Sequence, residues 1–270
     1  MNIKIGFSPC PNDTFIFAAL INGHIYSGNY FFDPVIADVQ ELNALAGNSI
    51  LDVTKLSYSA FCKFEDDFIL LNSGSALGHG VGPLLIVPNS SLFHYGRQLV
   101  PNCKVALPGR ETTANFLFDF FQDLPVQKVF LPFNEIEEAV QNQIVDAGVI
   151  IHENRFTYFD HGLKKIMDLG EFWEEKTAYP IPLGGIVAKK ALGLSIAQDI
   201  SSLIKESIQF AMNNPRVVWP YIKHHAQEMD DDVIWSHINL YVNDYTLDLG
   251  ELGKKAIEKM KQVYSSMYRI

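Results

Sequence analysis

The stretches GPLLIVP (residues 82–88) and PLGGIVAK (residues 182–189) decide the fold. Each begins with Pro and Gly residues and continues as a short apolar run, which predicts a buried strand. A complete cycle of alternating strands and helices lies between them. We therefore expect the chain to leave one lobe along the first stretch, to build a second lobe, and to return along the second. Residues 1–88 and 186–270 would then form lobe 1, residues 89–185 would form lobe 2, and a ligand cleft would lie between the lobes.

Short apolar runs alternate with helical patterns through the first two-thirds of the sequence. The expected strands are residues 3–7, 51–56, 68–71, 83–87, 104–107, 128–131 and 147–151. The expected helices between them are residues 13–21, 38–46, 57–64, 112–121 and 135–143, with Asn12 or Asp13 as the N-cap of the first. This alternation predicts an α/β fold with parallel strands. The last part of the chain is almost wholly helical, with helices expected over residues 201–212, 215–224, 232–242 and 250–267.

The charge of the chain excludes several classes of partner. Its 270 residues include 31 acidic and 21 basic side chains, so the formal net charge is −10. Nucleic acids and anionic membranes are bound mainly through clustered Lys and Arg, and neither is an expected partner. An anionic ligand must therefore be held by local donors and not by the overall field.

Cysteine content and the first residues indicate a compartment. Cys10, Cys62 and Cys103 are an odd number without paired spacing, which favours a reducing environment, and no spacing of ligand-type residues suggests a metal site. The apolar start is too short for a secretory signal and is broken by Pro9 and Pro11. The uncharged stretch 68–96 is interrupted by glycines, so it does not resemble a membrane span. We expect a cytoplasmic protein.

Candidate site residues lie at the ends of two early strands, those expected over residues 3–7 and 51–56. After the first strand, two prolines stiffen a turn that leads to Asn12, Asp13 and Thr14; a stiff turn with a helix N-cap explains the same residues. Lys55 closes another strand, and Ser57 opens the next helix beside a potential anion site. An exposed lysine and a capping serine are the alternative explanation.

Two later strands are followed by further candidates. Thr112 and Thr113 begin a helix after a Pro-Gly turn, where free backbone N–H groups, the helix dipole and two hydroxyls can hold a carboxylate without net positive charge. Such threonines also serve as simple caps. An apolar strand delivers His152 at its carboxyl end, in position for a general base near neutral pH, although a structural histidine is the alternative.

Six stretches of the chain closely resemble the 1,4-dihydroxy-6-naphthoate synthase family of the futalosine route to menaquinone. They are SPCPNDTFIF (8–17), TKLSYSAF (54–61), LGHGVGPLL (77–85), PGRETTA (108–114), VIIHENRFTY (149–158) and PIPLGGIVAKK (180–190). The resemblance implies a two-lobed, periplasmic-binding-protein-like (type II) α/β fold with two hinge strands and a helical C-terminal end. It also implies a cytoplasmic enzyme that acts on a small anionic molecule with no metal or redox cofactor. Members often carry arginine where this chain has His79, a difference that matters if that arginine contacts the substrate or pins the hinge.

The same resemblance implies a reaction and residues that perform it. The family is a lyase family that converts cyclic dehypoxanthine futalosine to 1,4-dihydroxy-6-naphthoate and a sugar-derived fragment. The histidine of its IIHE motif is the base, which is His152 here, and Ser57, Thr112 and Thr113 match its substrate pocket.

Three points go beyond these matches or stay open. We further expect Asn12, Asp13 and Thr14 to bind sugar-derived hydroxyls and Lys55 to contribute to the substrate pocket. The alternative functions are a chorismate dehydratase of the same pathway and a non-catalytic cytoplasmic protein that binds a carboxylate. The sequence specifies neither the oligomeric state nor the role of Cys10.

Overall fold

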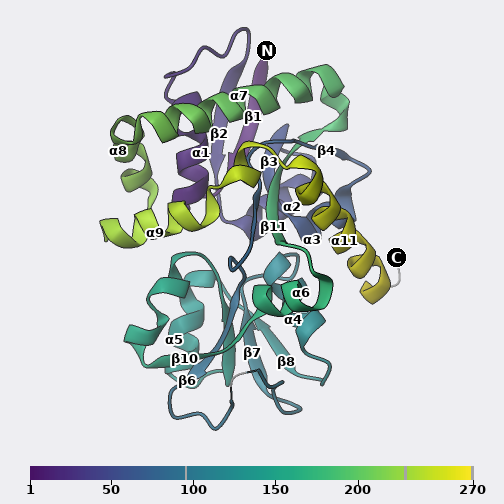
Figure 1. Cartoon of the computed structure of the whole chain (residues 1–270), viewed down its shortest axis with the longest axis vertical. Coiled ribbons are helices and arrows are strands. Elements are labelled where there is room, and N and C mark those ends of the chain that lie inside the picture. The colour runs from purple at the N-terminus through teal and green to yellow at the C-terminus, as the bar shows by residue number, and fades with distance from the viewer. Residues whose placement is uncertain (95, 228–229, 269–270) are drawn as a thin grey trace.

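Two separate sheets define two lobes in the computed structural model, which describes residues 1–94, 96–227 and 230–268 (Figure 1). The strands of lobe 1 are β1 (Asn2–Phe7), β2 (Phe31–Ile36), β3 (Val53–Ser57), β4 (Phe68–Leu70), β5 (Ala76–Gly78) and β11 (Ile181–Lys189). Their order is β2-β1-β3-β11-β4, with β5 also paired to β11. β1 runs parallel to β2 and β3, whereas β11 runs antiparallel to β3, β4 and β5.

Lobe 2 is built on the second sheet. Its strands are β6 (Leu84–Pro88), β7 (Lys104–Leu107), β8 (Gln127–Phe130), β9 (Ala147–Ile150) and β10 (Leu163–Asp168). They lie in the order β10-β6-β9-β7-β8. β7 is parallel to β8 and β9, so the carboxyl ends of these three strands lie at one edge of the sheet, the edge that faces lobe 1.

Helices cover both sheets. Those of lobe 1 are α1 (Pro11–Ile21), α2 (Val39–Gly47), α3 (Tyr58–Phe64), α7 (Leu194–Asn213), α8 (Pro215–His225), α9 (Asp231–Tyr241), α10 (Asp244–Leu247) and α11 (Gly250–Tyr268). Those of lobe 2 are α4 (Thr113–Phe121), α5 (Ile136–Gln141) and α6 (Leu169–Thr177), with the 3-10 turns η1 (Phe133–Glu135), η2 (His152–Phe156) and η3 (Tyr158–His161); η4 (Lys190–Leu192) follows β11. α11 runs from lobe 1 down to lobe 2, where the hydroxyl of Tyr268 donates to Asp119 (Figure 1).

The core of lobe 1 shows why the apolar spacing produces this packing. Ile200, Ile204 and Ile208 recur every four residues along α7, so they form one stripe, and all three are fully buried. They pack in one cluster with Ile3 and Ile5, which alternate along β1 toward the same face of the sheet. Burying each such side chain stabilises the fold by about 1.5–3 kcal/mol, so this helix–sheet contact holds the lobe together.

The chain crosses between lobes at residues 79–83 and again between α6 and β11. β6 pairs with β9 and β10 of lobe 2, and β11 pairs with strands of lobe 1. Hydrogen bonding thus assigns all of β6 to lobe 2 and all of β11 to lobe 1. The crossings therefore lie earlier in the chain than the expected boundaries after residues 88 and 185. The repeated Gly and Pro residues stand at the crossings themselves.

Two glycines bring the crossing segments into backbone contact. A Cβ atom on Gly82 would lie 2.2 Å from the backbone nitrogen of Gly170, and one on Gly170 would lie 2.7 Å from the Cα atom of Gly82. Arg155 fastens the same place, since its guanidinium donates to the Gly82 carbonyl and to Asp168. Only glycine fits at both positions. The glycine at residue 82 therefore allows the two crossing segments to lie in backbone contact.

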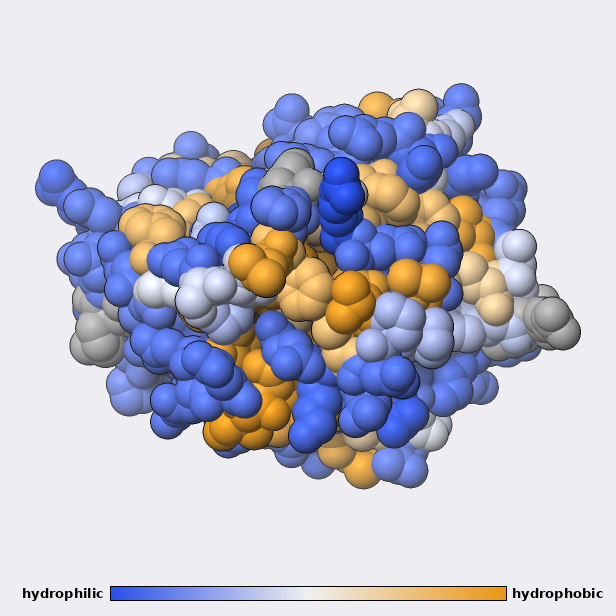
Figure 2. Space-filling view, turned by 90° about the horizontal axis from the view of Figure 1, so that it is seen from below, coloured by the Kyte–Doolittle hydropathy of each residue, from blue (hydrophilic) through white to orange (hydrophobic). Residues whose placement is uncertain are grey.

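Exposed apolar side chains gather at the far end of lobe 2, where hydrophobic residues occupy the middle of the face seen from below (Figure 2). The loops at that end of the second sheet carry Leu92, Val100, Leu124, Ile144 and Phe159, all exposed. No helix within residues 1–94, 96–227 and 230–268 combines the length and apolar character needed to cross a membrane.

Replacing Gly82 with Ala is expected to lower the free energy of unfolding by about 1–3 kcal/mol, because the added methyl group has no room against the backbone of Gly170. Gly253→Ala is the matched control: in α11 the nearest atoms to its Cβ are the side chains of Tyr245 and Leu249, at 3.2 and 3.3 Å. Alanine there also gains helix propensity of up to about 1 kcal/mol. Urea denaturation followed by circular dichroism compares the two, and equal loss in both variants would contradict the contact.

Candidate functional site

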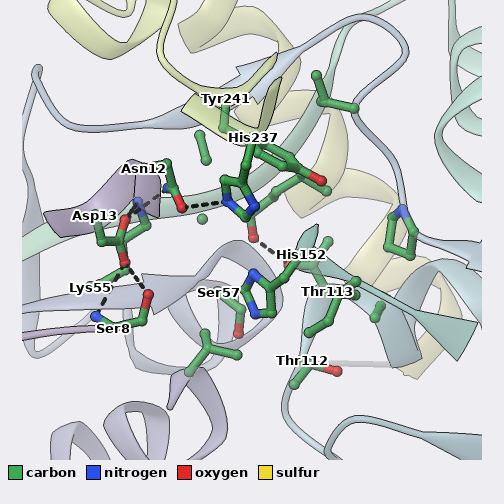
Figure 3. A pocket seen from close by; sticks show the side chains of 18 residues that line it. Ser8, Asn12, Asp13, Lys55, Ser57, Thr112, Thr113, His152, His237 and Tyr241 are labelled. Atoms are coloured by element: carbon green, nitrogen blue, oxygen red, sulfur yellow. Dashed lines mark hydrogen bonds and ion pairs between the residues drawn. The ribbon is translucent and has the colours of Figure 1, made fainter. Parts of the chain in front are cut away.

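A pocket lies between the two lobes and collects almost all the residues singled out from the sequence (Figure 3). Those that line it are Asn12, Asp13, Lys55, Ser57, Thr112, Thr113 and His152. They come from the start of α1, the end of β3, the start of α4 and the turn after β9. The carboxyl ends of strands from both lobes thus meet at one place, as in other α/β proteins.

The carboxylate of Asp13 is the centre of the polar network on the lobe 1 side (Figure 3). Its Oδ1 atom accepts from Lys55 Nζ at 2.8 Å and from Asn12 Nδ2 at 2.9 Å, and its Oδ2 atom accepts from Ser8 Oγ at 2.7 Å. Asp13 and Lys55 are both buried, so their charges cancel inside the pocket wall. Lys55 therefore offers a ligand a hydrogen-bond donor but little net charge.

The opening motif differs from the sequence prediction in its helix cap and in the position of Thr14. Cys10 occupies the N-cap position, and Pro11 begins α1, which suits the fixed φ and the missing N–H of proline. Asn12 and Asp13 thus do not cap the helix. Thr14 does not line the pocket: it is fully buried, and its hydroxyl donates to the Cys10 and Pro11 carbonyls. We correct its expected contact with the ligand accordingly.

The predicted hydroxyl donors already have partners. Ser57 Oγ donates to the Glu111 carbonyl at 2.8 Å, and Thr112 Oγ1 and Thr113 Oγ1 donate to the carbonyls of Gly109 and Leu183, each at 2.8 Å. Among the described residues no hydrogen bond uses the first two N–H groups of α4, those of Thr113 and Ala114. A bound carboxylate would therefore meet these N–H groups and the helix dipole, and the hydroxyls would have to exchange partners to join them.

His152 stands at the end of β9 in a left-handed backbone conformation, with φ +59°. This conformation is unfavourable for a residue with a Cβ atom, and such strain is typical of functional positions. Its Nδ1 atom lies 3.3 Å from Cys10 Sγ of lobe 1, and the Phe133 ring packs edge-on at a centroid distance of 4.8 Å. Burial lowers the pKa of His152 to about 4, against the opposing charges of Asp13 and Asp38. The imidazole is neutral near pH 7.

Sequence reasoning missed His237, which also lines the pocket. Its ring is fully buried and lies almost parallel to that of His152, at an interplanar angle of 13° and a centroid distance of 6.1 Å. Its Nε2 atom is 2.9 Å from Asn12 Oδ1, and burial holds its pKa well below the usual value. A signal was present: Ile234, His237 and Tyr241 share one helix face at spacings of three and four, so the histidine interrupts an apolar stripe.

His79 lies outside the pocket, at the crossing between the lobes. Its Nδ1 atom is 2.9 Å from Glu174 Oε2, and the other carboxylate oxygen of Glu174 accepts from the Gly80 N–H at 2.9 Å. His79 therefore contacts the hinge and does not line the pocket. In the part of the chain that the structure describes, no three His, Cys, Asp or Glu side chains gather as a metal site would require.

Solved structures with similar folds define the class of protein. A protein from Archaeoglobus fulgidus superposes with a TM-score of 0.91 at 31% identity, over 100% of this chain and 98% of that one. The periplasmic aliphatic sulphonate binding protein of Escherichia coli superposes with a TM-score of 0.69 at 13% identity, over 99% of this chain and 86% of that one. The fold is that of the periplasmic binding proteins, as the resemblance implied.

The sequence comparisons give the family. Residues 3–266 match the family described as "Menaquinone biosynthesis". Two proteins named 1,4-dihydroxy-6-naphtoate synthase are similar over most of their length: that of Thermus thermophilus is 41% identical over 96% of this chain and 92% of its own, and that of Streptomyces coelicolor is 42% identical over 94% and 90%. The chain belongs to this menaquinone-biosynthesis family. The resemblance and the prediction of an enzyme are confirmed, whereas the substrate and the histidine base stay predictions.

Replacing Lys55 with Met is expected to lower the free energy of unfolding by about 3–5 kcal/mol, because it leaves the Asp13 carboxylate buried without its counter-ion. Adding Asp13→Asn in the same protein should restore most of the loss, since no uncompensated charge then remains. Lys205→Met, at the exposed pair with Asp248, is the control and should cost less than about 1 kcal/mol. Urea midpoints measure all three, and equal losses for the two lysine variants would contradict the buried pair.

Proposed function

We propose that this chain is a carbon–carbon lyase that converts cyclic dehypoxanthine futalosine to 1,4-dihydroxy-6-naphthoate in the futalosine route to menaquinone. The curated relatives that carry this enzyme name support the proposal. His152 takes a proton from the bound substrate, a carbon–carbon bond breaks to release the sugar-derived fragment, and the second ring becomes aromatic. Aromatisation supplies driving force, so the protein mainly provides a base, orientation and exclusion of water.

The distribution of hydrogen-bond donors orients the substrate. The benzoate carboxylate is placed at the start of α4, where the Thr113 and Ala114 N–H groups and the helix dipole favour an anion. The sugar-derived hydroxyls are placed at the opposite wall, beside Asn12 and Asp13. Other residues that line the pocket are apolar, Val81, Pro83 and Leu183 among them, which suits a fused ring.

The observation that carries the proposal is the state of His152. A general base needs an unprotonated nitrogen in reach of the substrate, and burial keeps this imidazole neutral. The side chain of His152 lines the pocket, and its Nδ1 atom contacts Cys10. Its Nε2 atom makes no hydrogen bond with any of the described residues. Nε2 is therefore the atom assigned to accept the proton.

Replacing His152 with Gln should reduce turnover of cyclic dehypoxanthine futalosine by at least about 100-fold, because a general base contributes roughly that factor or more. Binding of the substrate, measured by calorimetry, should change little. His224→Gln, on an exposed residue in α8, is the matched control and should keep full activity. Product is followed by absorbance and mass; near-normal turnover in the His152 variant would reject the base.

The same assay separates the alternative functions. Stoichiometric binding of the cyclic substrate with no naphthoate product would favour a binding protein. Dehydration of chorismate with no action on the cyclic substrate would favour the chorismate dehydratase. Formation of 1,4-dihydroxy-6-naphthoate supports the lyase.

The pH dependence of kcat/KM should show an acid limb with its midpoint near pH 4, because kcat/KM reports the free enzyme and the pKa of His152 is lowered to about 4. The imidazole is neutral above that pH and protonated below it. The rate constant should therefore stay level from about pH 5 to 7 and fall roughly tenfold per unit below the midpoint. A midpoint near 6.5, the ordinary histidine value, would contradict a base whose pKa is lowered by desolvation.

A further inference from the structure

The proposed reaction leaves part of the opening motif unexplained. Cys10 is buried with 4% exposure, it lies behind the pocket wall, and its Sγ atom is 3.3 Å from Nδ1 of His152. The contact joins the two lobes, since Cys10 follows β1 and His152 follows β9. The thiol therefore touches the base on the edge of the ring that faces away from Nε2.

The surrounding residues fix the place of this thiol. Pro9 and Pro11 flank Cys10 and restrict the backbone on both sides. The Cys10 carbonyl accepts from the N–H of Thr14 at 3.0 Å and from its hydroxyl at 3.1 Å. Ser8 Oγ accepts from the Cys10 N–H at 3.4 Å. Thr14, which does not reach the pocket, thus has a function in holding Cys10.

We propose that Cys10 is a positioning residue that holds the proton of neutral His152 on Nδ1, so that the lone pair of Nε2 faces the substrate. The inference rests on the proposed role of His152 as the base. The hydrogen bond made by one ring nitrogen decides which nitrogen of a histidine carries the proton. Cys10 is the partner of Nδ1 among the described residues, so it controls that choice.

The chemistry of a buried thiol suits this role. Burial and the neighbouring Glu153 raise the pKa of Cys10 well above its usual value, so the sulfur stays uncharged. A neutral sulfur accepts a weak hydrogen bond from Nδ1–H and, unlike a carboxylate, does not stabilise the imidazolium. The base is oriented while its pKa stays low. The opposite arrangement, S–H donating to Nδ1, would put the proton on Nε2 and block the base.

The other groups around His152 do not determine which ring nitrogen carries the proton. The charged ones that influence it are Asp13 on α1, Asp38 at the N-cap of α2 and Lys55 on β3. None of the three bonds to Nδ1. The rings of Phe133 and His237 pack against the imidazole and restrict its tilt, but neither specifies where its proton resides.

Nitrogen NMR of the unliganded protein, labelled in histidine, tests the proposal directly. Two-bond proton–nitrogen spectra distinguish a protonated from an unprotonated ring nitrogen, and His152→Gln assigns the signal. We expect the wild-type protein to carry the proton on Nδ1, Cys10→Ala to shift it toward Nε2, and Cys10→Ser to keep it on Nδ1. A wild-type ring protonated on Nε2, or an unchanged ring in Cys10→Ala, would overturn the proposal.

Kinetics give a second readout that a structural role alone would not produce. Cys10→Ala should lower kcat by at least about tenfold, a typical loss for a partner that orients a histidine, while KM changes by less than about threefold. The acid limb of kcat/KM should move to higher pH, because water beside Nδ1 reduces the effect of burial. Cys10→Ser should recover most of kcat.

Cys103→Ala is the matched control, since Cys103 is also buried but lies before β7, outside the pocket. Its kcat and acid limb should equal those of the wild type. If Cys10→Ala does not fold, the wild-type spectrum and Cys10→Ser still decide the question. Full turnover in His152→Gln would reject the base but leave the effect of Cys10 on the ring measurable, so the two failures are distinguishable.

Discussion

The carbonyl oxygen of Glu111 joins the two lobes, and the pocket depends on that junction. Three donors of lobe 1 converge on this one atom of lobe 2: Ser57 Oγ and Ser59 Oγ at 2.8 Å and Asn43 Nδ2 at 3.2 Å. A buried donor that loses its partner costs about 1–3 kcal/mol, so separating the lobes here is expensive unless water or a ligand replaces the carbonyl. Because His152 belongs to lobe 2 and Cys10 to lobe 1, these two side chains meet only while the lobes are in contact.

The same junction explains which parts of the site could be predicted from the sequence. Residues near or after the carboxyl ends of strands, such as Lys55 and His152, could be placed because strand carboxyl ends converge at one edge of a sheet. The hydrogen bonds of Ser57 could not, because its partner Glu111 is 54 positions away. His237 was harder still, since its local signal is an interruption of an apolar helix stripe and its partner Asn12 is 225 positions away.

The elements that sequence reasoning missed are those whose pattern is ambiguous. β2 contains Pro34 and lies at the edge of its sheet, so its residues do not alternate between buried and exposed. β10 reads LKKIMD, in which charged residues obscure the strand pattern. In β10 the amine of Lys164 donates to the Ser91 carbonyl. Strand propensity cannot predict such a tertiary contact. The long apolar helices, by contrast, were recognised because their stripes are regular.

Charge distribution links the composition to the chemistry. The chain carries a net charge of −10, and Lys55, which lines the pocket, is neutralised by Asp13. In the proposed function an anionic substrate would therefore be attracted by N–H groups and a helix dipole, which exert their effect only at short range. A protonated histidine would bind an anion better, but it could not accept a proton. Burial keeps the imidazoles of His152 and His237 neutral, so in the proposed function the anion would be held at the start of α4.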